Sequence, residues 1–143
     1  MPIKVIEYGS AHYKEMVALR TEILRKPLGL VFTDEELEKE NKDLLIGAFE
    51  DDRLLACCIL TPLSNTSYKL RQMAVSQKMQ RLGIGAVMLQ FAENLAHDAR
   101  YDTIILNART TAIGFYEKMG YAIHGEEFIE VGIPHVEMRK KIN

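Results

Sequence analysis

Residues 73–86, Met-Ala-Val-Ser-Gln-Lys-Met-Gln-Arg-Leu-Gly-Ile-Gly-Ala, contain the turn that decides the fold. A strand over 68–75 ends at Val75, a polar turn follows, and Gly83 and Gly85 stand where the next helix begins. Glycines at a helix N-terminus let backbone N–H groups approach a ligand at the positive end of the helix dipole. The turn therefore suits a phosphate or pyrophosphate, although a plain tight connection between strand and helix fits the same residues.

The segments on either side of this turn predict an α/β protein with a mixed sheet. The strand over 68–75, a helix over 83–100 and a β-branched strand over 103–107 form a parallel βαβ unit of the usual right-handed kind. The elements expected before this unit are a strand at 3–9, a helix at 11–26 capped by Ser10, a short helix opened by a capping box at 33–36, and a hairpin of 44–49 with 54–60. Those expected after it are a helix at 111–119, one strand or a bent strand within 121–131, and a last strand at 136–142.

Composition limits the function further. The chain has 143 residues, 48% of them hydrophobic, with 18 Lys+Arg against 20 Asp+Glu and a formal net charge of −2. This length predicts one domain, residues 1–143, and the charge balance excludes a general binder of nucleic acids or membrane surfaces. The charge is uneven, because residues 53–92 contain five basic side chains and no acidic one. This acid-free segment includes the glycine turn and favours an anionic ligand, although buried strands exclude acids as well.

The N-terminal residues and the cysteines indicate the compartment. No signal peptide is visible at the N-terminus, and the longest apolar run, 54–60, is far too short to span a membrane. Cys57 and Cys58 are adjacent, so they would point to opposite faces of a strand and cannot join distant segments. With no metal-ligand spacing and no disulfide framework, we expect a cytoplasmic protein without a bound metal.

Two motifs resemble signatures of one family. Gln80-Arg81-Leu82-Gly83-Ile84-Gly85 matches the Gln/Arg-x-x-Gly-x-Gly/Ala signature of the GNAT superfamily of acyl-CoA-dependent N-acetyltransferases. The segment 112–121, Ala-Ile-Gly-Phe-Tyr-Glu-Lys-Met-Gly-Tyr, is similar to the family's second signature, Ala-x-x-Phe-Tyr-x-x-x-Gly-Phe/Tyr. The order of elements is also the family's order, so the resemblance covers essentially the whole chain and is to small bacterial members. It implies a mostly antiparallel sheet with a splayed central parallel pair and flanking helices.

The resemblance implies acetyl-CoA as the cosubstrate. The pyrophosphate would be held by the backbone of the turn, which comprises Gln80, Arg81, Leu82, Gly83, Ile84, Gly85 and Ala86. The free backbone groups of the splayed strand end would hold the pantetheine arm and polarise the thioester carbonyl, and they belong to Met73, Ala74 and Val75. Many family members have an Asn at the position of Arg109 here, and the nearest Asn is Asn107. We expect Asn107 and Arg109 near the cofactor, with Arg109 facing a phosphate, a substrate carboxylate or solvent.

The resemblance also implies a general acid, and residues of the C-terminal hairpin are candidates for the general base. Tyr116 stands at the family's general-acid position, where a phenol beside the sulfur can protonate the departing thiolate. Candidate bases lie in the C-terminal hairpin, with His135 preferred for its ordinary pKa and Glu126 as the alternative. The acceptor pocket would include Arg25, Glu127 and Glu130, although a solvated hairpin edge explains these glutamates equally well. Arg20 and Arg25 could recognise a carboxylate or phosphate on the acceptor, but for Arg20 we expect instead a helical position with its guanidinium in water.

These features together predict an N-acetyltransferase that moves an acetyl group directly from acetyl-CoA to the amine of a small molecule or a peptide. Neither a nucleic acid nor a membrane is an expected partner, and a homodimer is left open. The alternative is a non-catalytic acyl-CoA-binding regulatory module, since Arg109 departs from the family pattern and no base is decisive. Transfer of a longer acyl chain would depend on the room near Cys57, Ile59 and Met73.

Overall fold

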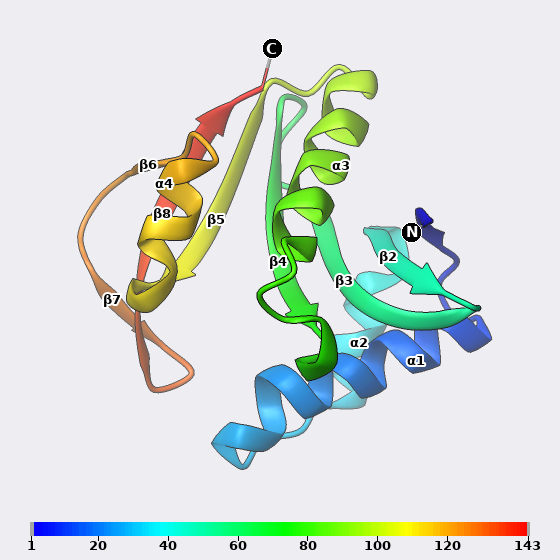
Figure 1. Ribbon diagram of the computed structural model, residues 1–143. Helices are drawn as coiled ribbons and strands as arrows, with labels where there is room; N and C mark the ends of the chain where they lie inside the picture. The colour runs from blue at the N-terminus through cyan, green and yellow to red at the C-terminus, as the bar shows by residue number, and fades with distance from the viewer. Residues whose placement is uncertain (1, 143) are drawn as a thin grey trace.

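The computed structural model describes residues 2–142, and its centre is one mixed sheet (Figure 1). The sheet has the strand order β1-β2-β3-β4-β5-β8-β6, with β7 paired to β8. All pairs are antiparallel except β4 with β5. The strands are β1 (Ile3–Ile6), β2 (Leu44–Glu50), β3 (Arg53–Pro62), β4 (Ser67–Val75), β5 (Thr103–Arg109), β6 (Ala122–Ile123), β7 (Phe128–Glu130) and β8 (Ile133–Lys141). This arrangement confirms the expected fold class.

Helical segments connect the strands. The α-helices are α1 (Ala11–Arg20), α2 (Asp34–Glu38), α3 (Ile84–Asp98) and α4 (Ile113–Lys118). Shorter helical turns are η1 (Thr21–Arg25, a π-helix), η2 (Lys26–Leu28), η3 (Lys39–Lys42), η4 (Gln77–Met79) and η5 (Thr110–Ala112). The predicted caps are confirmed, since Ser10 accepts from the backbone N–H of Tyr13 and Thr33 forms a capping box with Glu36. No helix within residues 2–142 has the length and apolar character needed to cross a membrane.

Several boundaries differ from those expected. The first strand ends at Ile6 rather than at 9, and the last strand begins at Ile133 rather than at 136. The helix predicted over 11–26 changes at Thr21 into the wider turns of η1 and then into the 3-10 turn η2, which contains Pro27. The segment 121–131 forms two strands, β6 and β7, and both pair with β8. Gly125 lies between them with a φ of 93°, a left-handed conformation that interrupts an extended chain.

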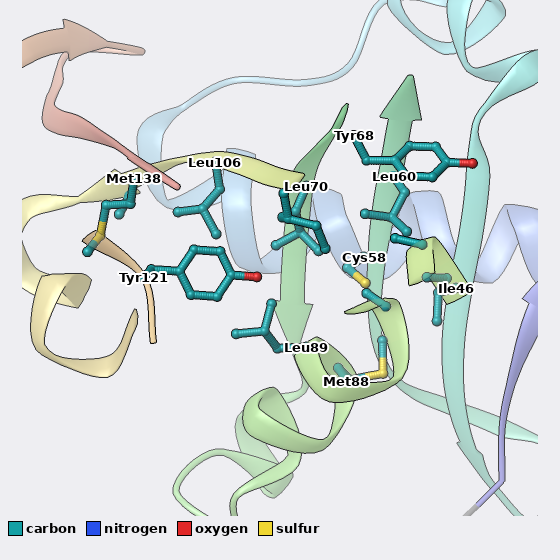
Figure 2. Close-up of a cluster of buried hydrophobic side chains, with 14 of the residues drawn as sticks. Ile46, Cys58, Leu60, Tyr68, Leu70, Met88, Leu89, Leu106, Tyr121 and Met138 are labelled. Carbon is teal, nitrogen blue, oxygen red and sulfur yellow. The ribbon is translucent and has the colours of Figure 1, made fainter. Parts of the chain in front are cut away.

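Helices cover the sheet on both faces. On one face, Met88 and Leu89 of α3 pack against the sheet in a cluster that includes Leu70 of β4 and Leu106 of β5 (Figure 2). On the other face, a second cluster includes Met16 of α1 and side chains of β2 and β3. Cys58 belongs to the first cluster and Cys57 to the second, which confirms that they point to opposite faces. Burial raises the pKa of the Cys57 thiol to about 12, so this thiol is not an activated nucleophile.

The parallel strands β4 and β5 separate toward their C-terminal ends, as Figure 1 shows. They pair only from Ser67–Leu70 with Thr103–Leu106, and the last part of β5 pairs with β8 alone. The register of β4 against β3 shifts opposite Cys58, and Gln72 at this bulge has a φ of 57°. A bulge bends its strand and redirects the residues that follow. It therefore turns 73–75 away from β5 and opens the sheet.

Candidate active site

A cavity of about 520 Å³ lies where β4 and β5 separate. Its walls come from five parts of the chain: the end of η1, both splayed strands, the first turns after β5, and the hairpin of β7 and β8. The lining residues are Leu24, Arg25, Lys69, Leu70, Arg71, Gln72, Met73, Leu106, Asn107, Ala108, Arg109, Ala112, Tyr116, Glu130, Val131 and His135. Residues far apart in the sequence thus meet because one pair of strands fails to stay paired.

The alternation of side chains along the strands decides which residues face which side of the opening. Leu70 and Leu106 belong to the cluster under α3. Successive residues of a strand point to opposite faces, so Lys69, Arg71 and Asn107 project toward the face on which α1 packs. Tyr116 lies on α4 and packs against the cluster under α3. The cavity therefore has walls on both faces of the sheet, and two reactants can enter it from opposite sides.

The N-terminus of α3 has the properties of an anion-binding turn. Gly83 precedes the helix with a φ of 79°, and the helix has neither a side-chain cap nor an acidic residue in its first turn. A Cβ added at Gly85 would meet nothing closer than Phe115 Cζ at 3.5 Å. The side chain of Gln80 donates to the carbonyl of Val75 at 3.1 Å and so ties the turn to the end of β4. The backbone N–H groups of the first helical turn are left for a ligand.

These observations fit an acyl-CoA. The uncapped helix end would hold its pyrophosphate, through the turn that contains Gln80, Arg81, Leu82, Gly83, Ile84, Gly85 and Ala86. The opening between β4 and β5 suits its extended pantetheine arm, along the strand end formed by Met73, Ala74 and Val75. An acyl-CoA bound here would supply a thioester to the cavity.

Tyr116 lines the cavity and packs on aromatic neighbours. Its ring makes edge contacts with Phe115, at 5.0 Å between ring centroids, and with Tyr121, at 5.8 Å. Burial raises the pKa of Tyr116 to about 12. The phenol is therefore a neutral O–H donor at every pH near neutrality, as a general acid must be.

His135 is 5% exposed and lies at the same cavity, opposite Arg109 in the β5–β8 ladder. Its Nδ1 is 2.8 Å from the carbonyl oxygen of Ile133. Because a carbonyl oxygen only accepts, Nδ1 bears the hydrogen in the neutral ring, and the lone pair is on Nε2. This tautomer leaves Nε2 able to accept a proton. Pro134 lies between the two residues in β8, and its ring restricts the backbone φ at this place in the strand.

The other predicted site residues fall into two groups. Asn107 and Glu130 both line the cavity and are joined by a hydrogen bond of 3.0 Å from Asn107 Nδ2 to Glu130 Oε2. Arg25 also lines it, pairs with Glu36 at 2.9 Å and stacks on the ring of Phe32. Glu126 and Glu127 are exposed in the loop between β6 and β7 and are not among the lining residues.

The expectation for Arg20 is wrong. Arg20 is fully buried and forms a two-pronged ion pair with the buried Glu40, with distances of 2.8 and 2.7 Å. The Tyr13 hydroxyl donates to the same carboxylate at 2.8 Å. A charge is tolerated at zero exposure only with such partners. The pairing spans 20 residues of sequence, which no local periodicity reveals.

Sequence reasoning also overlooked Lys69 and Arg71 as lining residues. They alternate with the buried Tyr68 and Leu70 in β4. Two basic residues on one face of an otherwise apolar strand are a signal that could have identified them.

The comparisons with known proteins agree with this geometry. Residues 25–142 match the family model described as an acetyltransferase (GNAT) domain. An uncharacterised N-acetyltransferase of Bacillus subtilis (strain 168), YjcF, is 28% identical over 95% of this chain and 97% of its own length. The chain therefore belongs to the GNAT family of acetyltransferases and is an N-acetyltransferase.

Solved structures show the same fold at low sequence identity. The crystal structure of a putative N-acetyltransferase from Lactobacillus plantarum has a TM-score of 0.86 at 21% identity and covers 100% of both chains. That of aminoglycoside 6'-N-acetyltransferase complexed with coenzyme A has a TM-score of 0.83 at 19% identity, covering 100% of this chain and 98% of that one.

Proposed function

We propose that the protein transfers an acetyl group from acetyl-CoA directly to an amine, with Tyr116 as general acid and His135 as general base. The observation that supports this most strongly is that the Tyr116 phenol and the His135 imidazole line one cavity at the splayed strands. An acid for the leaving group and a base for the nucleophile are the two proton-transfer groups that direct aminolysis of a thioester needs.

The protons balance in this scheme. Acetyl-CoA supplies the thioester, whose C–S bond breaks as the C–N bond forms. His135 Nε2 removes one proton from the attacking amine, which is mostly protonated at neutral pH and must first reach its neutral form. The Tyr116 hydroxyl gives one proton to the departing sulfur. The products are the N-acetylated amine and coenzyme A.

Backbone groups at the end of β4 would position the carbonyl. The N–H groups of Met73, Ala74 and Val75 that do not pair with β3 have no strand on the β5 side. Donors of this kind stabilise charge that develops on the carbonyl oxygen. Asn107 and Arg109 would then border the pantetheine on the β5 side, and Glu130 holds Asn107 in place.

The test is a screen for release of coenzyme A thiol from acetyl-CoA over classes of amines, with thermal stabilisation by coenzyme A as the control for binding. We expect stabilisation and amine-dependent release, with the acetylated amine identified by mass spectrometry. Stabilisation without acetylation of any amine would contradict the proposal and favour a non-catalytic acyl-CoA-binding module. Release that does not depend on an amine would also contradict it.

A further inference from the structure

The chemical class of the acceptor is indicated by the charges around the cavity. Four basic side chains line it, namely Arg25, Lys69, Arg71 and Arg109, against one acidic side chain, Glu130. Lys69 and Arg109 have no ion pair within the described part of the chain, residues 2–142. A polycationic acceptor would be repelled here, whereas an acceptor with an anionic group would be attracted.

Lys69 and Arg71 form the best-defined part of this basic lining. They are two residues apart on β4 and point to the same face, so their Cβ atoms are separated by roughly 6.6 Å. One carboxylate or phosphate between them can accept from both side chains. The helix end suited to the pyrophosphate lies beyond the other end of β4, so these two cations are not needed for it.

The carboxyl groups near Arg71 already have partners within the protein. Glu40 is 3.8 Å from Arg71 and is held at shorter distances by Arg20 and the Tyr13 hydroxyl. Asp43 is the other nearby carboxyl; burial raises its pKa, and the charge of Arg71 opposes this shift. Arg20 and Arg71 thus share Glu40, and no carboxylate within residues 2–142 forms an ion pair with Lys69. The buried Nε of Arg71 has no hydrogen-bond partner.

The geometry points to an acceptor that bears both an amine and a carboxylate or phosphate, with the anionic group bound between Lys69 and Arg71. This assignment rests on the proposed function of the same cavity. Arg71 precedes Met73, at the proposed thioester site, by two residues, so the amine and the anionic group are separated by several bonds. The basic surroundings also disfavour the ammonium form and so favour the neutral nucleophile.

The test compares matched acceptors. Glycine, β-alanine and γ-aminobutyrate are each assayed against the alkylamine of the same chain length, phosphoethanolamine against ethanolamine, and spermidine serves as the polycation. We expect kcat/KM to favour the anionic member of at least one pair by about tenfold or more, since a charged hydrogen bond contributes this much. The pairs distinguish a carboxylate from a phosphate. Equal or better use of the amines that lack an anionic group, or of spermidine, would overturn the inference.

Substitutions of Lys69 test whether this residue causes the preference for acceptors with an anionic group. In Lys69→Gln the ratio of kcat/KM between the members with and without an anionic group should fall about tenfold, and Lys69→Arg should restore it. The matched control Lys14→Gln changes an exposed lysine of α1 and should leave the ratio as in the wild type. A ratio that does not change in Lys69→Gln would overturn the assignment of the anionic group to this place.

A binding experiment separates this inference from the proposed function. Inorganic phosphate is added to protein saturated with coenzyme A, so that the pyrophosphate site is occupied. We expect a rise in Tm that is lost in Lys69→Gln and retained in Lys14→Gln. If no amine is acetylated but this shift is seen, the proposed reaction is wrong and the anion site stands. If phosphate gives no shift, the anion site is wrong even if amines are acetylated.

Discussion

At the scale of single residues, the proposed reaction depends on Tyr116 and His135. Burial against the core keeps the Tyr116 phenol neutral, and the Ile133 carbonyl holds His135 in the tautomer with a free Nε2. Neither condition needs an additional charged partner. Both follow from the place of each residue next to the opening between β4 and β5.

Tyr116→Phe should lower kcat by about 10²-fold or more and leave the KM for acetyl-CoA nearly unchanged, because only the proton for the departing sulfur is removed. The measurement is steady-state kinetics with a competent amine. Tyr8→Phe is the matched control, since Tyr8 is partly exposed on the loop before α1 and does not line the cavity. Unchanged turnover in Tyr116→Phe across the pH range would exclude the acid role.

His135→Gln should lower kcat/KM by about 10²-fold, because it removes the group that is proposed to take the proton from the amine. The measurement is steady-state kinetics with a competent amine. His124→Gln, at an exposed histidine after β6, should keep the wild-type kcat/KM. If His135→Gln keeps the wild-type activity and Glu126→Gln loses it, then Glu126 is the base instead.

At the scale of elements, two connections matter most: the turn into α3 and the contact of α1 with η3. The first leaves the N-terminus of α3 without a side-chain cap, and the second buries the Arg20–Glu40 ion pair on the face of the sheet that α1 covers. The turn into α3 thus leaves backbone groups free for a ligand, whereas the contact of α1 with η3 contributes to stability.

Gly85→Ala separates ligand binding from folding in the α3 turn. A methyl group at this position meets Phe115 at an ordinary van der Waals distance of 3.5 Å, so the protein alone accommodates it. Alanine is the better helix former by about 0.5–1 kcal/mol, so Tm should rise slightly. The affinity for coenzyme A, measured by calorimetry, should fall if the pyrophosphate lies against this backbone. A variant with unchanged affinity would place the ligand elsewhere.

Removal of one partner of the Arg20–Glu40 pair should destabilise the protein strongly. Glu40→Gln leaves the buried guanidinium of Arg20 without its counter-charge, which typically costs about 3–5 kcal/mol of unfolding free energy. The double variant Arg20→Met/Glu40→Leu removes both charges and should cost less than Glu40→Gln alone. Urea unfolding measures all three proteins. A small loss of unfolding free energy in Glu40→Gln would show that water or Asp43 compensates the charge of Arg20.

At the scale of the whole molecule, the sheet consists of two parts, β1–β4 and β5–β8. Within residues 2–142, strand pairing joins these parts over Ser67–Leu70 and Thr103–Leu106, and the backbone N–H groups of Asp102 and Thr103 donate to the Thr66 carbonyl just before β4. A ligand that lies between the separated ends of β4 and β5 would contact both parts and add a connection that the chain lacks.

Coenzyme A should therefore stabilise the fold as a whole. At a concentration about 100 times its Kd, the gain is about 2.7 kcal/mol, or roughly 6–10 °C in Tm for a chain of this size. Amide hydrogen exchange should slow in residues 72–75 in the same samples. Stabilisation without protection of 72–75 would mean that the ligand does not enter the opening.

Much of this architecture was predictable because its causes are local. The β-branched strands, the capping residues Ser10 and Thr33, and the glycines before α3 act within a few residues of themselves. The opposite directions of Cys57 and Cys58 follow from the pleat of any strand. The family likewise followed from two motifs at a fixed spacing, and the comparisons confirm it.

What the sequence by itself determined is therefore most of the order of elements, the glycine turn that begins α3, and the family. Only the tertiary structure decided that Arg20 is buried with Glu40, that Glu126 and Glu127 lie outside the cavity, and that Lys69 and Arg71 line it. The physical reason is that burial and pairing of a charge depend on groups distant in the chain. These groups meet only when the bulge at Gln72 separates two strands that would otherwise remain paired.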